Sequence, residues 1–154
     1  MRVVVGAGVA LLAVLVLAVG ASALLDDDAA AQAAGVRLAG EDASVRGVGF
    51  FEQDGDRMTG FVAVWGLEPN TEHAVHFHGP SSECGTKADP VAVHPDLKAD
   101  EDGVAYTNVE LTAEQPLLTG GFYYNVHEGP SSQAENPEIA CGDLAPRDAS
   151  AAAG

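Results

Sequence analysis

Basic residues are scarce in this chain of 154 residues: Lys and Arg number 7 against 23 Asp and Glu, and the net charge is −16. A chain this acidic does not bind nucleic acid or anionic lipid through charge, and it repels small anions at long range. Outside an N-terminal apolar run, the sequence also lacks the 3.6-residue spacing of apolar residues that marks an amphipathic helix. These absences exclude nucleic-acid binding and leave a β-rich fold as the prediction.

Cysteine is equally sparse, since Cys84 and Cys141 are the two in the sequence. Two cysteines in an exported domain most simply form one disulfide, which would stabilise the fold by roughly 4 kcal/mol by closing a long loop. The alternative is that one or both bind a metal as thiolates, which fits an oxidising compartment less well.

The N-terminus has the composition of a secretory signal. Met1-Arg2 precedes an apolar run from Val3 to Leu25, and the small-residue motif Ala21-Ser22-Ala23 lies near the end of this run. We interpret residues 1–23 as a signal peptide, or alternatively as a retained anchor, because the run is long enough to span a bilayer. The protein is therefore expected to be secreted or extracytoplasmic, with membrane contact through an uncleaved N-terminal segment at most.

Composition divides the remainder into one domain and two flanking segments. Residues 24–40 are rich in Ala and Asp, which is typical of a flexible linker, and residues 147–154 predict a disordered tail. The roughly 105 residues between them, 41–146, suffice for a single hydrophobic core.

Apolar and polar residues alternate with a period of two along most of this domain. Two such runs, Val45–Gln53 and Arg57–Trp65, flank Asp54-Gly55-Asp56 and predict a β-hairpin. Many short runs separated by Gly-, Pro- and Asp-rich turns predict an all-β fold, an antiparallel β-sandwich or barrel. The stretch 79–102 is expected to be a long functional loop. The further strands are expected at His73–Gly79, Gly103–Thr112, Gly121–Glu128 and Glu138–Leu144.

The histidines are concentrated in one part of the domain. Residues two apart in a strand share a face, so His76 and His78 are expected to project together. Imidazole is the commonest side-chain ligand of copper and zinc, and copper(II) favours nitrogen-rich tetragonal sites. The alternative for any single histidine is a surface group or a satisfied core residue. We predict a copper site built from several of the five histidines, which are His73, His76, His78, His94 and His127.

In their order and spacing, several segments resemble the copper/zinc superoxide dismutase family. The resemblance covers about Val45 to Leu144 and implies a Greek-key antiparallel β-sandwich or barrel. It also implies the conversion of two superoxide anions to oxygen and hydrogen peroxide. The segments that carry the resemblance are Val45–Gln53, Gly66-Leu67, the H-x-x-H-x-H motif of His73–His78, Asp100–Ala105, Val126–Glu128 and Ala140–Gly142.

The resemblance also implies a role for each candidate residue. His94 would be a fourth copper ligand and catalytic, released and rebound during the redox cycle, while His73 would hydrogen-bond within the loops. Cys84 and Cys141 would form the intrasubunit disulfide. The remaining copper ligands would be His76, His78 and His127.

Two departures from the family pattern weaken this implication. Beyond His94 no histidine remains for a zinc site, and Asp96 alone falls far short of four ligands, so a copper-only centre without zinc is expected. Glu138 stands where the family places the arginine that attracts superoxide, so electrostatic guidance is expected to be weak.

Two other functions stay open at this stage. One is an extracellular copper-binding protein, a buffer or carrier on a dismutase scaffold with little or no activity. The other is a structural β-domain related to secreted CHRD-type modules, because Asn125-Val126-His127 fits that pattern too. Copper loading would exclude the structural module, and a superoxide assay would separate the enzyme from the buffer. The oligomeric state does not follow from the sequence.

Overall fold

The computed structural model describes residues 32–41, 44–80 and 82–147. The proposed signal segment, most of the linker and most of the tail lie outside these residues. Within them the chain forms strands and no helix, so nothing there has the length and apolar character of a membrane-crossing helix. The strands are β1 (Gln32–Ala39), β2 (Arg46–Asp54), β3 (Arg57–Trp65), β4 (Glu72–His73), β5 (Val75–His78), β6 (Pro90–Val93), β7 (Leu97–Lys98), β8 (Val104–Thr112), β9 (Tyr123–His127), β10 (Glu138–Asp143) and β11 (Ala145–Arg147).

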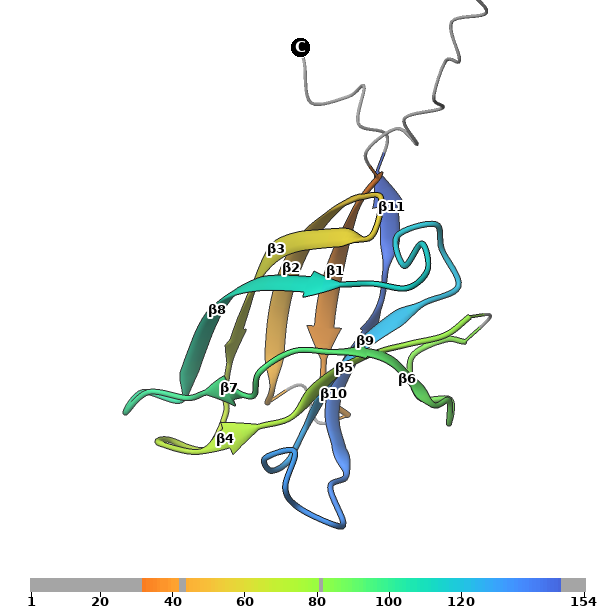
Figure 1. Cartoon of the computed structure of the whole chain (residues 1–154). Helices are drawn as coiled ribbons and strands as arrows, with labels where there is room; N and C mark the ends of the chain where they lie inside the picture. Colours follow the sequence, from red (N-terminus) through yellow and green to blue (C-terminus); the bar gives the residue numbers. More distant parts are fainter. Residues whose placement is uncertain (1–31, 42–43, 81, 148–154) are drawn as a thin grey trace, which may run out of the picture.

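One antiparallel sheet curls into a nearly closed barrel (Figure 1). Its strand order is β6-β5-β9-β10-β1-β2-β3-β8, with β11 pairing the start of β1, and β4 and β7 form a separate two-stranded sheet. Along the chain the next strand of this sheet after β3 is β5, and the two are not neighbours in the strand order, as in a Greek key. The prediction of an all-β Greek-key antiparallel fold is confirmed.

The predicted β-hairpin is also confirmed. β2 and β3 pair from Arg46↔Trp65 to Asp54↔Arg57, so Gly55 and Asp56 alone make the connection. Gly55 has a φ of 58°, a left-handed conformation that two-residue hairpin turns require and that glycine adopts without steric cost.

β1 corrects the linker prediction. Gln32–Ala39 pairs along its whole length with β2 and contacts β10 and β11 on its other side. Val36 and Leu38 are buried. The small residues that precede them in the strand, Ala33, Ala34 and Gly35, allow close packing. The prediction of flexibility is wrong for these residues, because the neighbouring strands rather than local β-propensity fix their conformation.

The strand predicted over His73–Gly79 is divided at Ala74. The Ala74 amide donates to the Gly129 carbonyl oxygen, and the Ala74 carbonyl accepts from the His127 amide. As a result β4 pairs β7, whereas β5 pairs β6 and β9. The predicted loop 79–102 therefore contains two short strands, β6 and β7.

Three aromatic rings pack against one another in the barrel core and connect β2 with β5 and β9. Phe51 of β2 packs edge-on against Phe77 of β5, with ring centroids 5.0 Å apart, and Phe77 packs against Tyr124 of β9 at 4.9 Å. All three side chains are fully buried. Packing of this kind fixes the position of β5 and β9 relative to the rest of the barrel.

Cys84 and Cys141 form a disulfide, as predicted. Their Cα atoms are 5.5 Å apart and the bridge spans 57 residues of sequence. The Cys84 amide also donates to the Asp143 carboxylate at 2.8 Å, so two contacts tie the segment after β5 to β10. A disulfide is compatible with an extracytoplasmic location.

Candidate metal centre

The alternation of β5 sends its histidines to one face of the sheet. Val75 and Phe77 are buried in the barrel core, so His76 and His78 project from the opposite face. In the neighbouring strand Asn125 lies directly across from His76, and His127 follows two residues later on the same face. Three imidazoles from two adjacent strands therefore meet outside the barrel core.

The three rings are close enough to share one ion. The ligand atoms of His76, His78 and His127 all lie within 4.8 Å of one another, and His76 Nδ1 is 3.2 Å from His127 Nε2. The ring centroid of His76 lies 5.7 Å from that of His78 and 4.9 Å from that of His127. This group can bind a metal ion.

His78 has a nitrogen that is ready to act as a ligand. Its Nδ1 donates to the Ala88 carbonyl oxygen at 2.8 Å, which leaves the lone pair on Nε2. Nε2 is buried and finds no hydrogen-bond partner among the described residues. Tyr123 stacks on the ring, with centroids 4.7 Å apart and planes 9° from parallel. A rigidly held, unpartnered imidazole nitrogen is unfavourable in a metal-free core and is what a metal site requires.

A backbone carbonyl orients His127 in the same way. His127 Nδ1 donates to the Asn136 carbonyl oxygen at 2.6 Å, so Nε2 carries the lone pair. The Asn136 side chain in turn accepts from the Gly129 amide and donates to the carbonyl oxygens of Gly129 and Pro130. Asn136 thus holds both the ring and the loop that follows β9.

Burial and the neighbouring histidines keep the His76 ring neutral. Burial, followed by the neighbouring rings of His127 and His78, lowers the pKa of His76 to about 4. A neutral imidazole is the form that binds a metal, so His76 is available as a ligand at neutral pH.

Asn125 joins the site to an acidic residue. Its Nδ2 lies 3.0 Å from His127 Nε2 and donates to the Glu138 carboxylate at 3.0 Å. A metal bound at His127 Nε2 would replace this amide contact, because the nitrogen has a single lone pair. The sequence placed Glu138 near the site but did not identify Asn125 as part of it. The feature that could have identified Asn125 is its position two residues before His127, on the same face of the strand.

His73 makes different contacts. Its Nδ1 donates to the His127 carbonyl oxygen at 2.8 Å, and its Nε2 lies 2.7 Å from the Thr71 hydroxyl. His73 therefore positions the backbone of His127 and has both ring nitrogens engaged.

The structure does not bring His94 into the group. Val93 pairs with His76, so the next residue turns to the other face, where its ring lies against Tyr124 and Phe77. His94 Nδ1 donates to the Pro95 carbonyl oxygen, and Nε2 accepts from the Tyr124 hydroxyl. Burial lowers the pKa of His94, which is consistent with a neutral ring.

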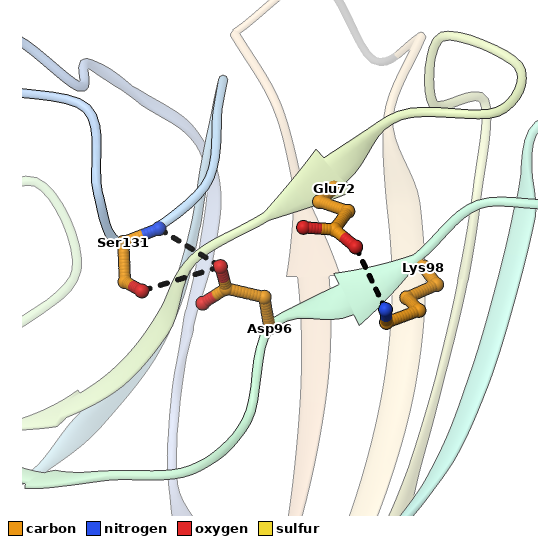
Figure 2. A network of polar contacts seen from close by, with 4 residues as sticks. All are labelled: Glu72, Asp96, Lys98 and Ser131. Atoms are coloured by element: carbon orange, nitrogen blue, oxygen red, sulfur yellow. Dashed lines mark hydrogen bonds and ion pairs between the residues drawn. The ribbon is translucent and has the colours of Figure 1, made fainter.

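Asp96 and Lys98 lie beside this centre in the pocket next to His76. The Asp96 carboxylate accepts from both the amide and the hydroxyl of Ser131, and Lys98 pairs with Glu72 at 2.7 Å (Figure 2). The pocket is lined by Glu72, His76, Val93, His94, Pro95, Asp96, Lys98 and Ser131.

One other cluster of metal-binding residue types occurs within the described ranges. It consists of Cys84, Cys141 and Glu138. The sulfur atoms of this cluster are joined in the disulfide and carry no thiolate charge, so it is a poor metal site.

The chain was compared with models of known protein families and with curated proteins. No family model matches the sequence, and no curated protein matches it at a significant level. The assignment of function therefore depends on the residues and geometry of the centre itself.

Proposed function

We propose that this protein is an exported copper-dependent superoxide dismutase with a copper-only centre. One observation carries the proposal: the nitrogens of His76, His78 and His127 converge within 4.8 Å, and the buried Nε2 of His78 has no partner among the described residues.

The donor set favours copper over other metals. It consists of imidazole nitrogens without thiolate or carboxylate, and among divalent first-row ions copper binds nitrogen sites most tightly. His78 and His127 each donate their second ring nitrogen to a backbone carbonyl, which fixes the ring orientation and increases the basicity of the ligating nitrogen.

The resemblance to the copper/zinc superoxide dismutase family supports superoxide dismutation as the proposed reaction. The nearly closed antiparallel barrel, the Cys84–Cys141 disulfide and the histidines of adjacent strands agree with what that resemblance implies. His73 is not in the metal group and hydrogen-bonds from β4 to the His127 carbonyl oxygen of β9, which is compatible with the structural role, although not the loop contact, that the resemblance implies.

A bound copper ion would supply one-electron exchange, so that two superoxide anions and two protons give one oxygen and one hydrogen peroxide. The protein holds the three imidazoles in place and keeps His76 unprotonated for binding. The carboxylates of Glu138, Glu72 and Asp96 lie around the centre with Lys98 as a counter-charge, so anionic substrate receives little attraction. We expect turnover well below the diffusion limit.

The test combines metal analysis with a superoxide assay on the same purified protein. Wild type should bind one copper(II) per chain, with a tetragonal nitrogen EPR signal, and should consume superoxide faster than the metal-free protein. His127→Gln should lose both properties, whereas the matched control His73→Gln should retain the copper. Copper binding that is independent of His127 and His78 would refute the proposal.

A second candidate is an extracellular copper buffer or carrier. The acidic surroundings of the centre favour it, because they concentrate cations and repel superoxide. Stoichiometric copper binding with superoxide decay no faster than that of the metal-free protein would identify the carrier.

A further inference from the structure

Tyr124 and His94 form a polar pair on the barrel side of the sheet, opposite the three metal-site histidines. Tyr124 neighbours Asn125 in β9, and alternation turns its side chain into the core, where it is fully buried. His94 follows the last residue of β6 and its ring stacks on Tyr124, with centroids 5.7 Å apart and planes 16° from parallel.

The hydrogen bonds of this pair leave His94 no free nitrogen. His94 Nδ1 donates to the Pro95 carbonyl oxygen at 2.9 Å, so Nε2 is the acceptor nitrogen of the neutral ring. The Tyr124 hydroxyl donates to that nitrogen. Tyr124 would lose its partner in a buried environment if His94 left, because no other hydrogen bond of the Tyr124 hydroxyl is present among the described residues.

We propose that Tyr124 is a positioning residue that occupies His94 Nε2 and keeps His94 out of the coordination sphere, so that the metal is held by three imidazoles. This inference rests on the proposed copper centre and refines it. It replaces the expectation of a fourth, exchanging histidine with a site that would have His76, His78 and His127 as its imidazole ligands.

His94 is nevertheless close enough for its position to matter. It lines the same pocket as His76, and it follows directly after Val93, the residue paired with His76. Loss of the Tyr124 hydroxyl would leave Nε2 of His94 with an unused lone pair beside the centre. The loop after β6 could then bring His94 to the metal as a fourth ligand.

The test counts imidazole ligands in copper(II)-loaded protein by pulsed EPR. Wild type and His94→Gln should both give three. Tyr124→Phe, which removes the hydroxyl and retains the ring, should give four and bind copper(II) about tenfold more tightly, the worth of one hydrogen bond of about 1.4 kcal/mol. The double variant Tyr124→Phe/His94→Gln should return to three ligands, which shows that the added ligand is His94.

Two results would overturn this inference while leaving the copper centre intact. One is the loss of an imidazole in His94→Gln alone, and the other is an unchanged ligand count in Tyr124→Phe. Metal-free protein gives an independent measurement, since nitrogen NMR of His94 should report Nε2 as a hydrogen-bond acceptor in wild type and as a free nitrogen in Tyr124→Phe. If copper does not bind, the proposed function fails. Independently of copper, identical nitrogen NMR spectra of His94 in wild type and in Tyr124→Phe would overturn the inference about Tyr124.

Discussion

The Nδ1 atom of His76 lies 3.2 Å from the Nε2 atom of His127, where the neighbouring strands β5 and β9 present their rings on one face. Both rings belong to the outer face of the same strand pair, so the separation is set by the sheet rather than by a flexible loop. Two nitrogens held so close can share a proton or a cation, but two protonated rings would repel one another.

This relationship predicts the pH dependence of the metal-free protein. The pKa of His76 is about 4 in the folded state and 6.5 in the unfolded chain, so as pH falls the unfolded state takes up the proton first. The contribution of His76 to the free energy of unfolding is fully present above pH 6.5 and is lost as the pH falls from 6.5 to 4. We expect a loss of about 1–2 kcal/mol in the free energy of unfolding, after allowance for solvent screening of a half-exposed ring.

Urea denaturation at several pH values, in the presence of a chelator, measures this effect. His76→Gln should reduce the slope of stability against pH between 6.5 and 4 without abolishing it, because burial lowers the pKa of His94 as well. An unchanged slope in His76→Gln would contradict the prediction.

His73 should matter for stability and not for ligand number. His73→Ala removes the hydrogen bond to the His127 carbonyl oxygen, a partly buried acceptor, and should lower the free energy of unfolding by about 1–2 kcal/mol. Copper(II) stoichiometry should stay at one per chain, because the His127 ring keeps its own bond to Asn136. Loss of copper with unchanged stability would show that His73 is a ligand instead.

Removing the disulfide should destabilise the domain strongly. The bridge spans 57 residues, for which the chain-entropy model gives about 4 kcal/mol. The double variant Cys84→Ser/Cys141→Ser should lose about this amount in chemical denaturation, and wild type under reducing conditions should match it. Equal stability with and without reductant would exclude a structural role for the bridge.

Reversing the charge of Glu138 should accelerate dismutation. Its carboxylate bonds to the amide that contacts His127, so an anion approaching the metal meets this negative charge. Glu138→Arg should raise the superoxide rate about 3- to 10-fold at low salt and make the rate fall with ionic strength.

Glu52→Arg is the matched control, since it makes the same charge change on the exposed outer face of β2. It should change the rate much less than Glu138→Arg. An equal effect of the two substitutions would show that net charge matters and that the position of Glu138 does not.

The sequence predicted the elements whose local pattern and fold agree. The β2–β3 hairpin consists of two β-rich runs around Asp54-Gly55, and the parity of His76 and His78 in β5 follows from any extended conformation. β1 escaped prediction because Ala33, Ala34 and Gly35 have low β-propensity and become a strand through their partners on both sides.

The convergence of the histidines was only partly predictable. His127 joins His76 because β9 pairs with β5, a contact between segments far apart in the chain that the family resemblance supplied. The direction of the His94 ring depends on β6 ending at Val93 and on the buried hydroxyl of Tyr124. Neither of these features leaves a local mark in the sequence.

The pairing of Ala33 with Arg147 places the start of β1 and the end of β11 side by side at one end of the barrel, whereas the loop after His127 lies at the other end (Figure 1). A dye, bead or electrode attached at Gln32 or Arg147 would therefore leave the histidine cluster pointing outward. Immobilised protein would keep its centre open to solution, so that dissolved metal ions could still reach it from the free side.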